Sequence, residues 1–299
     1  MQAVGVIGWG RMGGAMGLRL VNAGHQVFAF DVGRSARQAA QFAGATVLDS
    51  AKEVAERSPA FITMLPTATE VEAAAFSADG VLEGIKPGAL WLEMTSSKPS
   101  VTGRLAQLAG QRQAILLDCP VSGGVRGARE GRLTVIVGGA SEALDRARPL
   151  LENLGDRIVR VGERPGEGDL AKTINNMLSA INLAAAAEAL ALARAGGLAI
   201  EPLLEVVNSS TGASNATKVK IPDYVLTDRF DAGFTIAQYV KDLDVALDFA
   251  RAREVPAKLL SDAQDIWGAA AASGHGDDDH TAIVPLVAAR LGVPWGSEE

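Results

Sequence analysis

Three short segments of the sequence combine residue types and spacings that could perform redox chemistry. The first, Gly8-Trp9-Gly10-Arg11-Met12-Gly13, has the spacing G-x-G-x-x-G between a predicted strand and a predicted helix. Its first glycine allows a tight turn, its second lets a pyrophosphate approach the backbone, and its third permits close packing of the helix on the strand. Because the free N–H groups at the helix start would face phosphates, these six residues are predicted to bind a dinucleotide.

Asp31 bears on the choice between NAD and NADP. It ends the second predicted strand, about 20 residues beyond the glycines, where an acidic residue accepts hydrogen bonds from the adenosine ribose. Its negative charge would repel a 2′-phosphate, which favours NAD. Arg34 follows three residues later and could instead hold that phosphate, so NADP remains the alternative.

The second segment, Asp118–Gly124, follows the fifth predicted strand. Open α/β sheets bind their ligands at the carboxyl ends of the strands. The turn Ser122-Gly123-Gly124 could offer a hydroxyl and backbone N–H groups to a carboxylate, although a glycine-rich turn without a ligand explains the same residues. The turn is therefore a candidate anion site.

The third segment, Gly166–Asn176, begins a long predicted helix in which Lys172 and Asn176 share one face. A lysine in a partly dry cleft can donate a proton to a carbonyl that is being reduced, or remove the hydroxyl proton in the reverse direction. The asparagine amide could hold the substrate oxygen or orient the ammonium. On spacing alone, a solvated lysine is the commoner case.

The elements that must position these segments alternate along the first half of the chain. Short β-branched runs indicate strands, and longer stretches such as Arg11–Ala23, Ala36–Ala43 and Val101–Gln111 indicate helices. Such alternation predicts an α/β Rossmann domain, a mostly parallel, doubly wound sheet with helices on both faces. The predicted strands are Val4–Ile7, Gln26–Phe30, Phe61–Leu65, Leu90–Glu93, Ile115–Asp118, Leu133–Val137 and, more weakly, Ile158–Val161.

The pattern changes near Gly166-Glu167-Gly168, beyond which almost the whole chain is predicted to be helical. We therefore predict two domains joined by a long interdomain helix. Residues 1–165 form the dinucleotide-binding domain, and residues 166–299 form an all-α C-terminal domain. The turns expected in this second domain are at Gly196-Gly197, Asn208–Ala213 and Gly274–Asp279.

The composition argues against several classes of protein. Of 299 residues, 48 % are hydrophobic and 21 % charged, as in globular rather than disordered chains. A net charge of −7 argues against a nucleic-acid binder. The single cysteine, Cys119, excludes an internal disulfide and is expected to be a small buried hydrophobe. No metal site is expected, because only three histidines occur and the acidic loop Gly274–His280 is typical of a solvated helix cap.

Two features bear on where the protein resides. The first residues have no basic region and no long apolar core, unlike a signal peptide. The most apolar stretch, Ile181–Ile200, is interrupted by Glu188, Arg194 and Gly196-Gly197 and is rich in alanine, which favours a buried helix over a membrane span. We therefore expect a cytoplasmic protein with no membrane partner.

Five ordered blocks of the sequence, spread over nearly the whole chain, resemble the β-hydroxyacid dehydrogenase family, which includes 3-hydroxyisobutyrate dehydrogenase and tartronate semialdehyde reductase. Five blocks in the right order are far more specific than any one of them. The resemblance therefore favours a functional over a purely structural interpretation of each block. The blocks are Gly5–Gly13 with Ala23–Val27, Met64-Leu65-Pro66, Asp118–Gly124 with Gly127 and Gly138-Gly139, Gly166–Asn176, and Lys241-Asp242-Leu243.

The resemblance implies roles for the residues around the substrate. Lys172 would be the catalytic acid/base, and Asn176 would assist it in substrate binding. The turn Ser122-Gly123-Gly124 would hold the carboxylate of the substrate.

The resemblance also implies contacts to the cofactor. Leu65-Pro66, at the end of the third predicted strand, and Ser96, after the fourth, would contact it. Lys241 would contact both cofactor and substrate from the helical domain, although an ion pair with Asp242 or Asp244 also explains this lysine.

Four residues depart from the family pattern without removing a proposed chemical group. Glu93 stands where Asp is more usual, and Cys119 stands where a small Ala is common. Arg126 and Arg132 flank the substrate turn, where smaller or neutral residues often occur. Arg126 could add a charged contact to the substrate or be solvated, and both possibilities stay open.

The resulting hypothesis is an NAD(P)-dependent oxidoreductase. It would reversibly transfer a hydride between the nicotinamide and a small β-hydroxy acid or its semialdehyde, with Lys172 moving the proton and no metal involved. The family resemblance also implies self-association through the Ala-rich helical domain, as a homodimer or homotetramer.

Three other functions are considered on this scaffold. A 6-phosphogluconate-type oxidative decarboxylase usually has a longer helical region. Imine reductases typically carry Asp or Tyr at the position of Lys172. A non-catalytic dinucleotide-binding sensor is disfavoured by the joint presence of Lys172, Asn176, Ser122 and Lys241.

Overall fold

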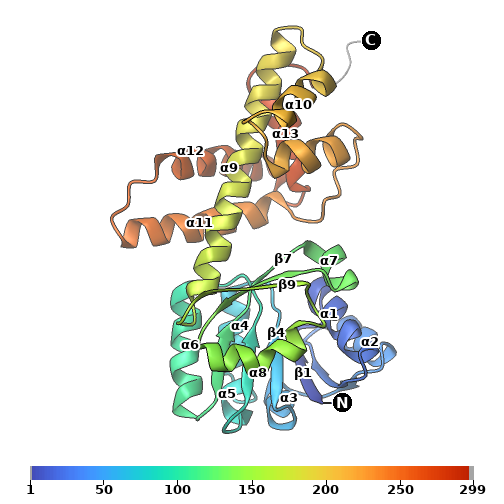
Figure 1. Ribbon diagram of the computed structural model, residues 1–299, viewed down its shortest axis with the longest axis vertical. Helices are drawn as coiled ribbons and strands as arrows, with labels where there is room; N and C mark the ends of the chain where they lie inside the picture. Colours follow the sequence, from blue (N-terminus) through green and yellow to red (C-terminus); the bar gives the residue numbers. More distant parts are fainter. Residues whose placement is uncertain (1, 296–299) are drawn as a thin grey trace. The chain divides into compact units, whose positions relative to one another are not determined.

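The chain divides into two compact units, Met1–Lys172 and Thr173–Glu299, of which the computed structural model describes residues 2–295. The first unit is a sheet with helices packed on it, and the second is helical (Figure 1). The predicted fold class, a mostly parallel doubly wound sheet followed by helices, is confirmed.

The strands of the first unit form one sheet in the order β3-β2-β1-β4-β5-β6-β8-β7, with β9 paired to β8. From β3 to β6 every pairing is parallel, whereas β8 runs antiparallel to β6 and β7. The strand order reverses between β1 and β4, and ligands of such sheets bind at this switch point, beyond the carboxyl ends of the strands. The strands are β1 Ala3–Ile7, β2 Gln26–Phe30, β3 Thr46–Val47, β4 Ala60–Thr63, β5 Leu90–Glu93, β6 Ile115–Asp118, β7 Val121–Ser122, β8 Thr134–Gly138 and β9 Arg157–Gly162.

Both faces of the central strands are buried, as a parallel sheet covered by helices requires. Val4 and Val6 pack in one apolar cluster with α1 residues such as Met16, while Phe61 and Trp91 pack in a second cluster with α3 and α6. Successive residues of a strand therefore pack alternately into the apolar clusters on the two faces of the sheet. The helices of this unit are α1 Arg11–Asn22, α2 Arg34–Phe42, α3 Ala51–Arg57, α4 Ala68–Phe76, α5 Val81–Gly84, α6 Pro99–Gln111, α7 Gly124–Glu130 and α8 Ser141–Leu151.

The second unit has its own apolar core, centred on the fully buried Trp267, whose indole N–H donates to the carbonyl oxygen of Ala180 at 3.3 Å. A capping box formed by Thr235 and Gln238 fixes the start of α11. Two segments are π-helical, a form that often marks functional sites. The elements are α9 Glu167–Ala195, which begins in the first unit, α10 Ile200–Ser209, η1 Ala216–Val225, α11 Ile236–Ala252, α12 Lys258–Ala270, η2 Ala271–His275, η3 His280–Ala282 and α13 Ile283–Arg290.

By length and composition α9 could cross a membrane, yet half of its most apolar window is buried. Ala180, Leu183 and Ala187 of this helix are fully buried in the core of the second unit. This burial agrees with the buried helix that the alanine-rich stretch predicts.

Each predicted strand and helix has a counterpart within a few residues of its predicted ends. The two strands that the prediction missed, β3 and β7, have only two residues each, too few for an alternating pattern to show.

Candidate active site

The loop after β1 holds three glycines in three different surroundings. Gly8 has φ +94°, and a Cβ there would lie 2.3 Å from the carbonyl oxygen of Met64. A Cβ on Gly13 would lie 1.9 Å from the carbonyl oxygen of Gly8, so only glycine lets α1 approach the strand this closely. A Cβ on Gly10 would meet no atom of the described residues within 4 Å. The loop is therefore closed against the protein and open at Gly10, which fits a passing pyrophosphate.

Asp31 bonds to this loop with one carboxylate oxygen and to the turn after β2 with the other. Its Oδ2 accepts from the backbone N–H of Trp9 at 2.6 Å, and its Oδ1 accepts from the N–H of Gly33 at 2.7 Å. Each oxygen keeps a further lone pair for a ribose hydroxyl. Arg34, the alternative partner for a 2′-phosphate, is exposed at the first position of α2.

Trp9 has a structural part in this loop that the sequence alone did not reveal. Its side chain is 5 % exposed, and a Cβ on Gly17 would lie 2.2 Å from a ring carbon. The indole of Trp9 therefore packs against α1 and fixes the glycine loop on that helix. Arg11 is exposed and Met12 half-buried at the start of that helix.

The loops after β4 and β5 are joined by one hydrogen bond. The hydroxyl of the buried Thr95 accepts from the N–H of Leu65 at 3.0 Å. Pro66 is exposed and Ser96 half-buried. β4 pairs in parallel with β1, and β5 pairs in parallel with β4, so these residues lie at the same edge of the sheet as the glycine loop.

Asp118 at the end of β6 connects the sheet to the first turn of α9. Its Oδ2 accepts from the backbone N–H of Asp169 at 2.8 Å. Burial, and next the charge of Asp169, raise the pKa of Asp118 from its ordinary 3.8 to about 7. This carboxylate caps the helix that carries Lys172 three residues after Asp169.

Asp169 and Glu93 complete a group of buried acids. The carboxylate of Asp169 accepts from the N–H of Ser97 at 3.2 Å and from the hydroxyl of Thr102 at 2.6 Å, which joins α9 to α6. Glu93 is paired with Asp118 across the strands, and burial raises its pKa well above the ordinary value. Sequence reasoning noted Glu93 only as a departure from the family pattern. It missed Asp169, whose signal was an acid in the first turn of the predicted helix.

The substrate turn begins at Ser122 in β7, which is paired with Thr134 of β8. Ser122 is half-buried, and Gly123 and Gly124 are exposed at the start of α7. The backbone of Gly123 and Gly124 is thus accessible, and Ser122 is partly so. That exposure is compatible with the carboxylate contact that the sequence predicts.

Lys172 and Asn176 are both buried, at 9 % and 8 % exposed, and stand one turn apart on α9. A solvated lysine, the commoner case on spacing alone, is therefore not what the structure shows. An ammonium kept from bulk water is suited to hold and release a proton in a reaction.

Asp242 on α11 organises the part of the candidate site in the second unit. Its Oδ2 accepts from the side-chain amide of Asn176 at 2.6 Å, and its Oδ1 pairs with the ammonium of Lys241 at 3.4 Å. The ion pair considered for Lys241 is thus present, and the same carboxylate also orients Asn176. Sequence reasoning named Asp242 only as a possible partner of the lysine.

Cys119 and Arg126, which the sequence analysis singled out, make contacts within the first unit. Cys119 is fully buried, and burial raises the pKa of its thiol, as expected for a small hydrophobe. Arg126 pairs with Glu130 at 2.9 Å on an exposed face of α7, and this bond lowers the pKa of Glu130.

The acidic loop near the end of the chain is tied to its own backbone. Asp279 accepts from the N–H of Thr281 at 3.0 Å and so caps η3, as predicted. His275 contacts Asp278 at 2.7 Å. Within residues 2–295, no group of three His, Cys, Asp or Glu side chains is placed to hold a metal ion.

A doubly wound sheet, a glycine loop open at its second glycine and an acid at the end of β2 define a dinucleotide-dependent oxidoreductase. Family models agree. The NAD-binding domain of 6-phosphogluconate dehydrogenase matches residues 3–162. The NAD-binding domain of NADP-dependent 3-hydroxyisobutyrate dehydrogenase matches residues 166–287.

Individual relatives match over nearly full length. The 2-(hydroxymethyl)glutarate dehydrogenase of Eubacterium barkeri is 34 % identical, over 97 % of this chain and 96 % of the relative. The NAD-dependent L-serine dehydrogenase of Pseudomonas aeruginosa is 34 % identical, over 96 % and 98 %. The structure of Mycobacterium tuberculosis 3-hydroxyisobutyrate dehydrogenase with L-serine has 35 % identity and TM-score 0.89, over 95 % of this chain and 98 % of that one.

This chain belongs to the β-hydroxyacid dehydrogenase family, among the relatives of 3-hydroxyisobutyrate dehydrogenase. It is an NAD(P)-dependent oxidoreductase that acts on the CH–OH group of a hydroxy acid. The alternatives of an oxidative decarboxylase or a non-catalytic sensor are not favoured, because the relatives are named as hydroxy acid dehydrogenases.

Proposed function

We propose that this enzyme reversibly oxidises a small 3-hydroxy acid with a primary alcohol to its semialdehyde, with Lys172 as the acid/base. The observation that carries this proposal is the buried Lys172, one helical turn before Asn176. The substrates for which the relatives are named support the substrate class. In 2-(hydroxymethyl)glutarate, L-serine and 3-hydroxyisobutyrate, a CH2OH group is attached to the carbon that bears the carboxylate.

The first unit would hold the cofactor. The glycine loop Gly8–Gly13 would contact its pyrophosphate, Asp31 its adenosine ribose, and Leu65-Pro66 and Ser96 its remaining parts. We propose NAD over NADP, because the Asp31 carboxylate would repel a 2′-phosphate. When bound, the nicotinamide supplies the two-electron acceptor for the alcohol carbon.

The residues of this chain would orient the substrate and move its proton. Ser122, Gly123 and Gly124 would hold the carboxylate. Lys172 Nζ would take the hydroxyl proton during oxidation and return it to the carbonyl oxygen during reduction. Asn176 donates through its amide nitrogen to Asp242, so its amide oxygen would accept from the Lys172 ammonium or the substrate hydroxyl. Lys241, held by Asp242, would contact substrate and cofactor.

Domain roles, assembly and location follow from the same proposal. Residues 1–165 would bind the dinucleotide, and residues 166–299 would bind substrate and mediate a homodimer or homotetramer. Apolar side chains exposed on the helices, among them Leu178, Leu192 and Leu259, support self-association. A cytoplasmic location is part of the same proposal, supported by the burial of half of the most apolar window of α9 inside the protein.

Replacing Lys172 by alanine tests the proposal. With 3-hydroxyisobutyrate or L-serine as substrate and NAD+ or NADP+ as oxidant, we expect kcat to fall by about two to four orders of magnitude. Cofactor affinity, measured by nicotinamide fluorescence, should remain near that of the parent chain. Near-normal turnover in Lys172→Ala would contradict the assignment, and a preference for NADP+ would contradict the role given to Asp31.

A further inference from the structure

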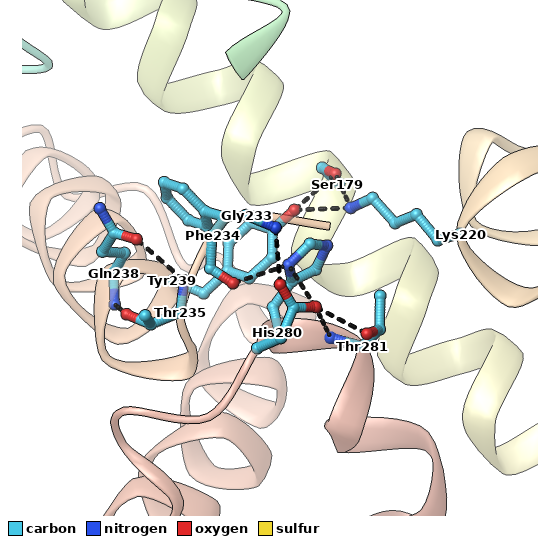
Figure 2. A network of polar contacts seen from close by, with 10 residues as sticks. Ser179, Lys220, Gly233, Phe234, Thr235, Gln238, Tyr239, His280 and Thr281 are labelled. Atoms are coloured by element: carbon cyan, nitrogen blue, oxygen red, sulfur yellow. Dashed lines mark hydrogen bonds and ion pairs between the residues drawn. The ribbon is translucent and has the colours of Figure 1, made fainter. Parts of the chain in front are cut away.

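Three polar side chains from three elements of the second unit meet in one cluster, composed of Ser179 on α9, Lys220 on η1 and Tyr239 on α11 (Figure 2). The ammonium of Lys220 donates to the hydroxyls of Ser179 and Tyr239 at 2.8 and 2.7 Å, and those hydroxyls lie 2.8 Å apart. Tyr239 is 4 % exposed, whereas Ser179 and Lys220 are half-buried. Tyr239 therefore forms the buried side of the cluster, and Ser179 and Lys220 form a side that is partly open to solvent.

The hydroxyls of Ser179 and Tyr239 together carry one hydrogen that the bonds within the cluster do not use. Each hydroxyl oxygen accepts from Lys220, and one of the two donates to the other. The hydrogen of the second hydroxyl is then directed away from this pair. An ammonium and a hydroxyl donor at one point are the groups that bind a carboxylate or phosphonate through charge-assisted hydrogen bonds.

His280 lies against the ring of Tyr239, with the ring centroids 5.1 Å apart. Its Nδ1 contacts the carbonyl oxygen of Phe234 at 2.9 Å, which requires a proton on Nδ1 and leaves a lone pair on Nε2. His280 is 3 % exposed, and its Nε2 has no hydrogen-bond partner among the described residues. A buried acceptor without a donor is costly, so His280 places one unsatisfied polar atom beside the cluster.

The same histidine leaves the positive charge on Lys220. Burial, and next the charge of Lys220, lower the pKa of His280 to about 4, so its imidazole is neutral near pH 7. The two nearby carboxylates have donors of their own, Asn176 for Asp242 and Thr281 with Gly233 for Asp279. Lys220 therefore supplies the positive charge of the cluster, and the imidazole of His280 beside it supplies none.

The cluster stands one helical turn from Asn176. Asn176 and Ser179 are neighbours on one face of α9, about 4.5 Å apart along its axis, and Tyr239 and Asp242 are neighbours on α11. The bonds Asn176–Asp242 and Ser179–Tyr239 join the two helices as successive rungs. A ligand whose hydroxyl lies at Asn176 thus reaches the second rung with a chain of a few carbons.

We propose that Lys220, with Ser179 and Tyr239, binds a second anionic group at the far end of the substrate. The enzyme then prefers hydroxy acids with two negatively charged ends over hydroxy acids with one carboxylate and an apolar tail. This inference rests on the proposed function, because it places the hydroxyl end of the substrate at Asn176.

A matched pair of substrates tests this preference. In 2-(hydroxymethyl)glutarate a carboxylate takes the place of the terminal methyl of 2-(hydroxymethyl)pentanoate, and the carbon chain is otherwise the same. The parent enzyme should show a kcat/KM for the diacid about tenfold to a hundredfold above that for the monoacid, the usual gain from a hydrogen bond to a charged group. Repeating the comparison with a terminal phosphonate shows whether carboxylate or phosphonate is the better distal group.

Replacing Lys220 assigns the preference to this residue. In Lys220→Met we expect the ratio of diacid to monoacid kcat/KM to fall to near one, mainly through the KM of the diacid, with monoacid turnover retained. Lys220→Arg keeps the charge and should retain part of the preference. Lys218→Met, two positions away on the same segment and exposed, is the matched control and should leave the ratio unchanged.

The outcomes separate this inference from the proposed function. If the parent enzyme oxidises neither acid while binding the cofactor, the proposed function fails. If it oxidises both acids equally, or if Lys220→Met weakens both equally, the proposed function stands and the inference on Lys220 is wrong, because a merely structural lysine affects both substrates alike.

Discussion

The two units hold their candidate site residues by different means. In the first unit, backbone geometry dominates, since glycines let α1 approach β1 and Asp31 accepts from the backbone N–H groups of Trp9 in the loop and of Gly33. In the second unit, side chains bond to side chains across helices, as in Asn176–Asp242 and Ser179–Tyr239. The first arrangement is specified over a few consecutive residues, whereas the second depends on partners about 60 residues apart.

This difference explains which parts a sequence motif can identify. Backbone sites need particular residues at fixed local spacings, so the G-x-G-x-x-G loop is recognisable before any tertiary contact is known. Side-chain pairs across helices leave no such spacing. The comparison also predicts that damage in the first unit affects the fold and the cofactor together, whereas damage in the second unit affects substrate handling.

The largest effect is expected for Gly13→Val. Its Cβ would collide with the carbonyl oxygen of Gly8, which as backbone cannot move aside, so α1 must shift from β1. We expect a loss of about 1–3 kcal/mol of stability and of about a hundredfold or more in cofactor affinity. Urea unfolding and nicotinamide fluorescence measure the two quantities.

Gly10→Ala is the matched variant in the same loop. Its Cβ points into open space, so stability should be unchanged while cofactor affinity still falls, because the methyl group occupies the path of the pyrophosphate. Unchanged cofactor affinity in Gly10→Ala would show that the open side of the loop is not where the cofactor passes.

A smaller effect is expected for Asp242→Asn in the second unit. The amide can still accept from Asn176, but it no longer carries the charge that holds Lys241. We expect kcat/KM for the hydroxy acid to fall about tenfold, the cost of one charge-assisted bond. The exposed Asp244, which accepts from Gln264 at 2.7 Å, provides the control: Asp244→Asn should change kcat/KM by less than about twofold. A similar loss in both variants would argue against a specific role for Asp242.

The last test concerns the pH dependence of stability through Asp118. Its pKa is about 7 in the folded chain, against an ordinary 3.8, so the folded state binds more protons than the unfolded state between these values. The free energy of unfolding should therefore fall as pH rises from about 4 to about 7 and level off above. Asp118→Asn should reduce this fall, by up to a few kcal/mol.

Urea unfolding at pH 5 and at pH 8 measures that difference, and Asp49→Asn on the surface is the control. An unchanged pH dependence in Asp118→Asn would show that this carboxyl does not carry the linkage. The buried Glu93, whose pKa is also raised, contributes with the same sign and remains in both chains.

Much of the fold could be predicted from the sequence, because its signals are local. Short β-branched runs located the strands, and the end of the alternation of strands and helices near Gly166 located the start of the helical region. The short strand β7 was missed, because it exists only through its pairing with β8.

The candidate site divides in the same way. The sequence by itself determined the dinucleotide loop, the acid at the end of β2 and the lysine on the long helix, since each is a residue type at a fixed distance from its own element. Only the tertiary structure decided that Lys172 is buried, that Asp118 and Asp169 anchor its helix, and that Asp242 joins Asn176 to Lys241. The physical reason is that burial and charge pairing are properties of packed neighbours, which the fold brings together from segments distant in the chain.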